Sequence, residues 1–179
     1  MGTCRNVDEV TSAVKKIKVG NVVMPQLGGV PPFHYIANDT SGKSIVIEYV
    51  NGELNIHQNP LGVLTNAPTF DWQITNLSNY VNLLTNNISD IKVEGVEIKG
   101  FGQGSGMLGL PGDFTPPSRF VRAVAFSSSA FPVQTAKEGI LQTFHILNQF
   151  DIPKGTARGV EQGKVVGDYT MWTGVSDLT

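Results

Sequence analysis

The sequence predicts an α+β domain in which helices pack on an antiparallel sheet. Short β-rich runs are joined by hairpin-type turns, amphipathic helical stripes lie before and after them, and no strand-helix-strand unit repeats. A length of 179 residues suits one domain, spanning 1–179, with a sizeable core. With 16% charged residues and a formal net charge of -2, the composition gives no support to a nucleic-acid partner or an anionic membrane.

The first predicted element is a short helix that begins after Asn6. Asn6 followed by Glu9 is typical of a helix start in which side chains satisfy the free backbone N–H groups. Apolar residues then recur at helical spacing, at Val7, Val10, Val14 and Ile17. The glycine- and proline-rich stretch at 27–32 cannot continue a helix, so we expect a loop there.

The centre of the chain is predicted to form the sheet. Asn51-Gly52 is the strongest turn signal, because both residues tolerate the positive φ of a type I′ hairpin turn. The run after it should pair with the run before it, which is rich in β-branched residues. Strands are expected at 33–37, 44–50, 53–57 and 61–65, the last one buried and ending at Asn66.

Helices are predicted to cover this sheet. Thr69 can cap a helix whose apolar face would comprise Phe70, Ile74, Leu77, Val81 and Leu84. A second helix should begin at Thr115, where prolines occupy the first turn, and a third should span about 135–149. The remaining stretches predict an irregular connection at 86–99, with or without a short strand, a glycine-rich loop at 100–112 and a final strand at 168–175.

Generic motifs point to neither a nucleotide nor a metal. Gly104-Ser105-Gly106-Met107-Leu108-Gly109 fits the dinucleotide fingerprint, but no helix opens after it because Leu110-Pro111-Gly112 follows. The three histidines lack the spacing of a metal pair, and a single cysteine excludes an internal disulfide. We therefore expect no metal and no cofactor. A dyad of Cys4 with a histidine stays open on sequence alone, because such partners meet in space.

Two polar residues are candidates for chemistry, each with a simpler competing interpretation. Asn66 could present an amide N–H to an oxyanion, although asparagine is also an ordinary turn residue. Arg119 lies in the first turn of a predicted helix, where a cation is unfavourable to the dipole, so a specific partner should hold it there. The competing interpretation is a surface salt bridge. We expect the two side chains to converge on one cleft although 53 positions separate them.

Taken together, several ordered segments resemble the choloylglycine hydrolase and penicillin V acylase family. The four that carry most of the likeness are Leu61-Gly62-Val63-Leu64-Thr65-Asn66-Ala67-Pro68-Thr69-Phe70-Asp71-Trp72-Gln73, Asn76-Leu77-Ser78-Asn79-Tyr80, Gly109-Leu110-Pro111-Gly112-Asp113-Phe114 and Ser118-Arg119-Phe120-Val121-Arg122-Ala123. The stretches at 43–49 and 167–170 are also similar, so the resemblance covers nearly the whole chain.

The resemblance implies part of an N-terminal nucleophile hydrolase with an αββα sandwich fold. Such an enzyme cleaves a linear amide of a conjugated bile salt, penicillin V or an acyl homoserine lactone through a cysteine thiolate, without metal or cofactor. Matched residue by residue, Asn66 would be the oxyanion-hole asparagine and Arg119 the arginine beside the nucleophile. Leu27 and Val30 would belong to a loop that borders the substrate pocket.

The start of the chain departs from this pattern. The segment around Cys4 resembles the start of an internal helix of the family, so Cys4 should not be equated with the nucleophile. We expect a middle-to-C-terminal portion that lacks the nucleophile segment and the last strands and is inactive alone. The alternative is a non-catalytic remnant that binds a ligand or partner. The expected partner is an amide substrate, and a homo-oligomer is left open. The compartment is also left open between the bacterial cytoplasm and the periplasm.

Overall fold

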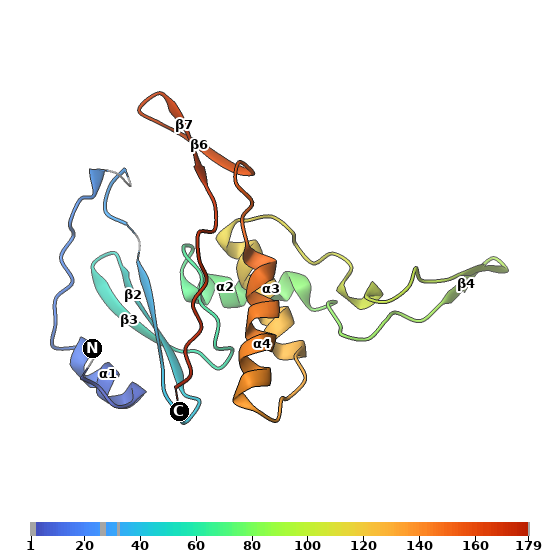
Figure 1. Ribbon diagram of the computed structural model, residues 1–179, viewed down its shortest axis with the longest axis horizontal. Coiled ribbons are helices and arrows are strands. Elements are labelled where there is room, and N and C mark those ends of the chain that lie inside the picture. Colours follow the sequence, from blue (N-terminus) through green and yellow to red (C-terminus); the bar gives the residue numbers. More distant parts are fainter. Residues whose placement is uncertain (1–2, 26–27, 32, 179) are drawn as a thin grey trace.

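A computed structural model describes residues 3–25, 28–31 and 33–178 of the chain (Figure 1). Helices and antiparallel strands are both present, which confirms the α+β class. The helices are α1 (Val7–Val14), α2 (Phe70–Asn76), α3 (Pro116–Ser129) and α4 (Ala136–Leu147). The strands are β1 (His34–Asn38), β2 (Ser44–Val50), β3 (Glu53–Gln58), β4 (Ile91–Val93), β5 (Val96–Ile98), β6 (Ala157–Glu161) and β7 (Lys164–Asp168).

The central sheet has the order β1-β2-β3 and is antiparallel throughout. Val50 pairs with Glu53 across the predicted turn, in which Asn51 and Gly52 have φ values of 52° and 83°. Both values lie in the left-handed region that a type I′ turn requires. The antiparallel sheet and its Asn-Gly turn are therefore confirmed.

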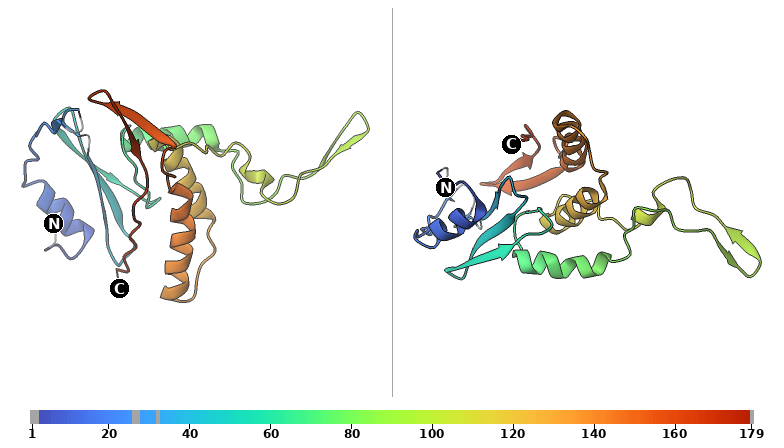
Figure 2. Two further views of the ribbon diagram at one scale, coloured as in Figure 1. Left: turned by 45° about the horizontal axis from the view of Figure 1, so that its top comes forward. Right: turned by 90° about the horizontal axis from the view of Figure 1, so that it is seen from below.

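Helices lie on both faces of β2. Its side chains alternate in direction, so its apolar residues are divided between the two faces. Ile45 and Ile47 pack against the apolar face of α1, whereas Val46 packs with Phe70 of α2 and Phe120 of α3. The sheet consequently separates two small cores, and α1 and the α2/α3 layer lie on opposite sides of it (Figure 2).

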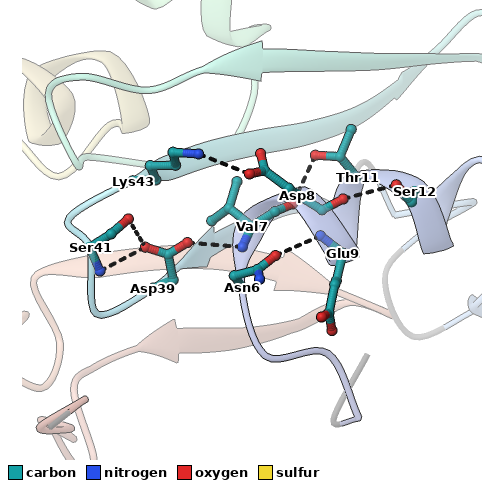
Figure 3. A network of polar contacts seen from close by, with 9 residues as sticks. All are labelled: Asn6, Val7, Asp8, Glu9, Thr11, Ser12, Asp39, Ser41 and Lys43. Atoms are coloured by element: carbon teal, nitrogen blue, oxygen red, sulfur yellow. Dashed lines mark hydrogen bonds and ion pairs between the residues drawn. The ribbon is translucent and has the colours of Figure 1, made fainter.

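The N-terminus of α1 is joined to the β1–β2 turn by a polar network (Figure 3). Asn6 Oδ1 accepts the N–H of Glu9 at 2.8 Å, as the capping pattern predicts. Asp39 Oδ2 accepts the N–H of Val7 at 3.0 Å, and Lys43 Nζ lies 2.9 Å from Asp8. The helix ends at Val14 rather than continuing to the predicted Ile17, so its apolar face comprises only three valines.

Three predicted elements need correction. The stretch at 61–65 is not a strand: Val63 is buried in the core, but its carbonyl accepts from the Asn59 side chain, so burial rather than sheet pairing explains its apolar character. The helix after Thr69 ends at Asn76 and passes into a 3-10 turn, which leaves Val81 and Leu84 exposed. The final strand is β7, which ends at Asp168 instead of beginning there.

Two hairpins were missed by the sequence analysis for the same reason. The β4–β5 turn contains Glu94-Gly95 and the β6–β7 turn contains Gln162-Gly163, and all four residues have positive φ. The backbone geometry matches that of Asn51-Gly52, but Glu and Gln are uncommon at the first turn position. The signal that identified one hairpin was therefore absent from the other two.

The β4–β5 hairpin is the end of a long arm, residues 81–108, that extends away from the rest of the molecule (Figures 1 and 2). Many of its apolar side chains are exposed: Val81, Leu84, Ile88, Ile91, Val93, Val96, Ile98, Phe101 and Leu108. At its base the N–H of Leu84 donates to Gly106 O at 2.9 Å. The two chain segments at the base of the arm are thus joined to each other by backbone contacts around Gly106.

We expect Gly106→Ala to disrupt the base of the arm. A Cβ at this position would collide with the carbonyl oxygens of Leu84 and Asn86, which are backbone atoms that a rotamer change cannot move. The expected result is loss of amide protection at Leu84 in hydrogen exchange while the central sheet keeps its protection. Gly112→Ala is the matched control, because its Cβ would meet open space. Unchanged protection at Leu84 would contradict the prediction.

Candidate active site

Asn66 and Arg119 contact each other directly in the structure. Arg119 Nη2 donates to Asn66 Oδ1 at 2.7 Å, across 53 sequence positions. The expected convergence of the two residues is confirmed. Because a guanidinium has only donors, the amide oxygen of Asn66 faces Arg119 and the Nδ2 amino group points away from it. The Asn66 side chain is exposed and can offer that amino group as a hydrogen-bond donor.

The loop that carries Asn66 is fixed at several points to its neighbours. Thr65 Oγ1 donates to Pro116 O at 3.2 Å, which ties the loop to the start of α3. Gln73 Nε2 donates to Asn66 O at 3.4 Å from the second turn of α2, and the Gln73 side chain is buried. The Ala67–Pro68 peptide bond that follows is cis. Asn66 therefore lies in a turn, as the simpler interpretation had it, and hydrogen bonds also fix its position.

The N-terminus of α3 positions Arg119. Asp113 accepts the Thr115 N–H at 2.9 Å and the Ser118 hydroxyl at 2.6 Å, so it satisfies the helix start although Thr115 itself forms no side-chain cap. Arg119 Nε donates to Phe114 O at 3.0 Å, within the same turn. The first turn of α3 thus directs the guanidinium toward Asn66.

The competing interpretation of Arg119 as half of a surface salt bridge is wrong for the part of the chain that the structure describes, where no carboxylate pairs with it. Burial lowers the pKa of Arg119, and the neighbouring Arg122 lowers it further. Arg122 is itself buried and donates to Pro111 O at 2.8 Å and Asp113 O at 2.6 Å. A partly buried cation without an anionic partner is suited to hold a thiolate or an oxyanion.

Comparison with known proteins decides the family. The model of the family of linear amide C-N hydrolases, choloylglycine hydrolase family, matches residues 1–179. The chain belongs to this family. It is 40% identical over 167 residues to a bile salt hydrolase/transferase of Clostridium perfringens, an alignment that covers 92% of this chain and 50% of that protein. The chain therefore spans about half the length of this relative.

Solved structures confirm the fold. A crystal structure of a variant of the conjugated bile acid hydrolase from Clostridium perfringens matches 92% of this chain and 50% of its own, with a TM-score of 0.71 and 36% identity. Penicillin V acylase from Agrobacterium tumefaciens shares the fold at 24% identity and a TM-score of 0.61, covering 85% of this chain and 39% of that one. The fold is thus that of the N-terminal nucleophile hydrolases, as the resemblance implied.

Cys4 lies in the α1 layer and not beside the pair. It packs against the cluster formed by α1, Ile45 and Ile47, on the face of the sheet opposite to α2 and α3. A dyad of Cys4 with His34 is not formed, because His34 contacts Glu48 on the other face. Within the described residues the structure supports no nucleophilic role for Cys4 at the site of Asn66 and Arg119.

Of the two residues assigned to substrate binding, Leu27 lies outside the described residues. Val30 is 47% exposed and lines a hollow of about 620 Å³ together with Met24, Phe33, Tyr35 and Tyr49. Asn21 and Asn51 also line it, and Tyr35 and Tyr49 place it on the α1 side of the sheet, away from Asn66 and Arg119. The role of Val30 in substrate binding stays a prediction.

The generic motifs prove to be structural. In the Gly104-Ser105 segment both N–H groups donate to Asn87 Oδ1, at 2.7 and 3.3 Å, so they are engaged within the arm. Among residues 3–25, 28–31 and 33–178 no group of three or more potential ligand side chains could hold a metal. Nor does any helix in these ranges have the length and apolarity needed to cross a membrane.

Sequence reasoning missed Glu48, which is fully buried at the centre of the sheet. Its carboxylate lies 2.9 Å from His34 Nδ1 and 3.5 Å from His57 Nε2. The signal was present in the sequence, because Glu48 is the only charged residue in the run at 44–50. Burying such a group requires compensating partners, which two of the three histidines provide.

The start of α3 should loosen in acid. Hydrogen bonds from Ser118 and then Thr115 lower the pKa of Asp113 from 3.8 to about 2. A depressed folded-state pKa means that this stabilisation is present above the unfolded value and is lost as the pH falls from about 4 through about 2. We expect Asp113→Asn to lower the urea midpoint at pH 7. Between pH 4 and 2 the urea midpoint of the variant should fall less steeply with pH than that of the wild type.

Asp39 titrates in the same range, because the Ser41 hydroxyl and other donors also lower its pKa to about 2. The measurement is therefore the difference between the wild-type and Asp113→Asn curves, with Asp39→Asn as a separate control variant. A difference that is constant from pH 7 to 2 would show that the Asp113 carboxylate contributes no pH-dependent stability.

Proposed function

We propose that this chain forms part of a hydrolase that cleaves the C–N bond of a linear amide, either a conjugated bile salt or penicillin V. The observation that carries the proposal is the 2.7 Å contact between Arg119 and Asn66, in a member of the linear amide hydrolase family. The pair places an amide donor and an unpaired guanidinium at one point, which is what attack on a carbonyl requires.

The proposed reaction begins when a cysteine thiolate bonds to the carbonyl carbon of the amide. The carbonyl electron pair moves onto oxygen, where the Asn66 Nδ2–H group donates to the developing oxyanion. Collapse of this intermediate breaks the C–N bond, and the amine leaves with the proton that the thiol lost when it became the thiolate. Water then hydrolyses the acyl-enzyme, which releases the acid and restores the thiol. Arg119 holds Asn66 in place and stabilises the negative charge near the reacting atoms.

We propose that the thiolate comes from a segment that these 179 residues do not include. Cys4 is the single cysteine of the sequence, and it lies on the α1 face of the sheet. Val30 stays a proposed substrate contact on the family resemblance alone, because the hollow that it lines includes Tyr35 and Tyr49, which pack on the α1 side of the sheet, away from Asn66 and Arg119.

The 179-residue chain by itself is expected to release no amine from glycine-conjugated bile salts or penicillin V. The reason is geometric, because the sheet separates Cys4 from Asn66 and Arg119. Amine release measured with purified protein should equal the buffer blank in both the wild type and Cys4→Ser. Turnover that disappears in Cys4→Ser would overturn this assignment.

A chimera tests the proposed function itself. The matching 167-residue stretch of the Clostridium perfringens bile salt hydrolase is replaced by the aligned residues of this chain. We expect the chimera to hydrolyse a conjugated bile salt or penicillin V, because it would supply Asn66 and Arg119 to an intact nucleophile. A folded chimera without turnover of either substrate would contradict the proposal.

The second candidate is a non-catalytic remnant whose partner would be a second copy of the chain. The observation that favours it is the arm at 81–108, whose apolar side chains are exposed. The chimera distinguishes the two candidates, since a remnant that has lost catalysis would give a folded but inactive protein. Sedimentation of the 179-residue chain, with and without residues 88–103, would show whether the arm joins copies.

A further inference from the structure

Glu48 is a buried carboxylate in the middle of the sheet whose role neither the fold nor the proposed chemistry has yet explained. It lies on β2 with no exposed surface, and it faces the α2/α3 layer as Val46 does. Burying a carboxylate is unfavourable unless hydrogen bonds and opposite charges compensate it. The contacts of this carboxylate therefore indicate what it does.

The shortest of these contacts reaches α2. Glu48 Oε1 accepts the N–H of Phe70, the first residue of the helix, at 2.8 Å. Thr69 occupies the cap position but does not cap the helix, because its hydroxyl bonds to Asp71. A carboxylate from the sheet thus satisfies one of the free N–H groups at the helix start, where negative charge is favourable.

Two imidazoles flank the same carboxylate, one from each neighbouring strand. His34 Nδ1 on β1 lies 2.9 Å from Oε1, and His57 Nε2 on β3 lies 3.5 Å from Oε2. The His57 ring also lies 5.5 Å from the ring of Phe70. The two imidazoles thus lie against the carboxylate from either side, while the hydrogen bond to it comes from the N–H of Phe70.

From Phe70 the connection continues to both candidate catalytic residues. Phe70 is four positions after Asn66, and Gln73 in the next turn donates to Asn66 O. On the other side, the Phe70 ring meets the ring of Phe120 edge-on at 6.1 Å, and Phe120 directly follows Arg119. The start of α2 therefore contacts the elements that carry each member of the pair.

We infer that Glu48, oriented by His34 and His57, is a positioning residue that fixes the start of α2 and so sets Asn66 against Arg119. Its importance for turnover rests on the proposed function, but its effect on the geometry of the pair does not. Glu48 touches neither the pair nor the reacting atoms and acts through the N–H of Phe70.

Two conservative variants separate the effect of the length of the Glu48 side chain from the effect of its charge. Glu48→Gln keeps the length of the side chain and an oxygen that can accept from Phe70, whereas Glu48→Asp keeps the charge but is one methylene shorter. In ¹⁵N NMR of the 179-residue chain, Glu48→Asp should shift the Arg119 Nε–H and Asn66 side-chain amide signals. It should also lower Phe70 amide protection by about tenfold or more, since a hydrogen bond to a charged acceptor is lost. Glu48→Gln should retain both signals near their wild-type positions.

The control is Ile47→Val, a buried change at the next position of β2 that faces α1 instead. It should lower the urea midpoint without moving the Arg119 and Asn66 signals. The inference is overturned if Glu48→Asp leaves those signals and Phe70 protection unchanged, or if Ile47→Val shifts them as much. The readout needs no turnover, so an inactive chimera would refute the proposed function and leave this result intact.

Discussion

Asn66→Ala in the chimera is expected to lower kcat by about 10²–10³-fold, the usual effect of removing one oxyanion donor. The Asn66 Nδ2 group is the donor that the Arg119 contact directs away from the guanidinium. Because that donor acts on charge that develops only in the transition state, KM should change much less than kcat. Steady-state hydrolysis of a conjugated bile salt or penicillin V by the purified chimera measures both constants.

Asn79→Ala is the matched control for this experiment. Asn79 is exposed and hydrogen-bonds only to the nearby Asn76 side chain among the described contacts, so its loss should leave kcat unchanged. A second variant, Asn66→Asp, keeps the oxygen that Arg119 binds but removes the amide donor. If Asn66→Asp retained full kcat, Asn66 would act only as a structural partner of Arg119.

Phe120→Ala is expected to lower the free energy of unfolding by about 3–5 kcal/mol, as other large-to-small aromatic changes in cores do. The Phe120 side chain is completely buried and packs with Val46, Val63 and Phe70 in the core between the sheet and α3. The cavity left behind would lie beside Phe70, the first residue of α2. Urea denaturation followed by circular dichroism measures the loss.

Phe131→Ala provides the comparison, because Phe131 is 86% exposed and its removal should change the urea midpoint little. Equal midpoints for the two variants would mean that the core around Phe120 is not a cooperative part of the fold. A large loss of stability at Phe120 with an intact Arg119 Nε–H signal would show that the pair is held by the N-terminus of α3 alone.

Local chemistry explains which elements could be predicted. Asn51-Gly52 identified its hairpin because these two side chains tolerate positive φ, and Asn6 identified the start of α1 because its side chain accepts the Glu9 N–H. Thr135 likewise begins α4 with a complete capping box shared with Glu138. In these cases the residues that define the element are neighbours in sequence, so their pattern is visible without the fold.

The candidate site was predictable only in part. Asn66 and Arg119 were identified through family-like segments, and their convergence followed from the expectation that ends of packed elements share a cleft. The lack of a carboxylate partner for Arg119 could not be predicted, because charged groups throughout the chain were available to it. That Cys4 lies in a different layer also depended on which face of β2 each helix covers.

The sequence by itself determined the α+β class, the central antiparallel sheet and the starts of all four helices, because periodicity, caps and turns act over a few residues. Tertiary structure alone decided that 61–65 is a loop. Val63 packs in the core, and its carbonyl accepts a hydrogen bond from the Asn59 side chain instead of pairing with a strand. Tertiary structure also decided the role of Glu48, whose 2.8 Å bond to Phe70 spans 22 positions. The effect of a buried charge depends on the groups that contact it, and packing brings these groups together from separate strands and a helix.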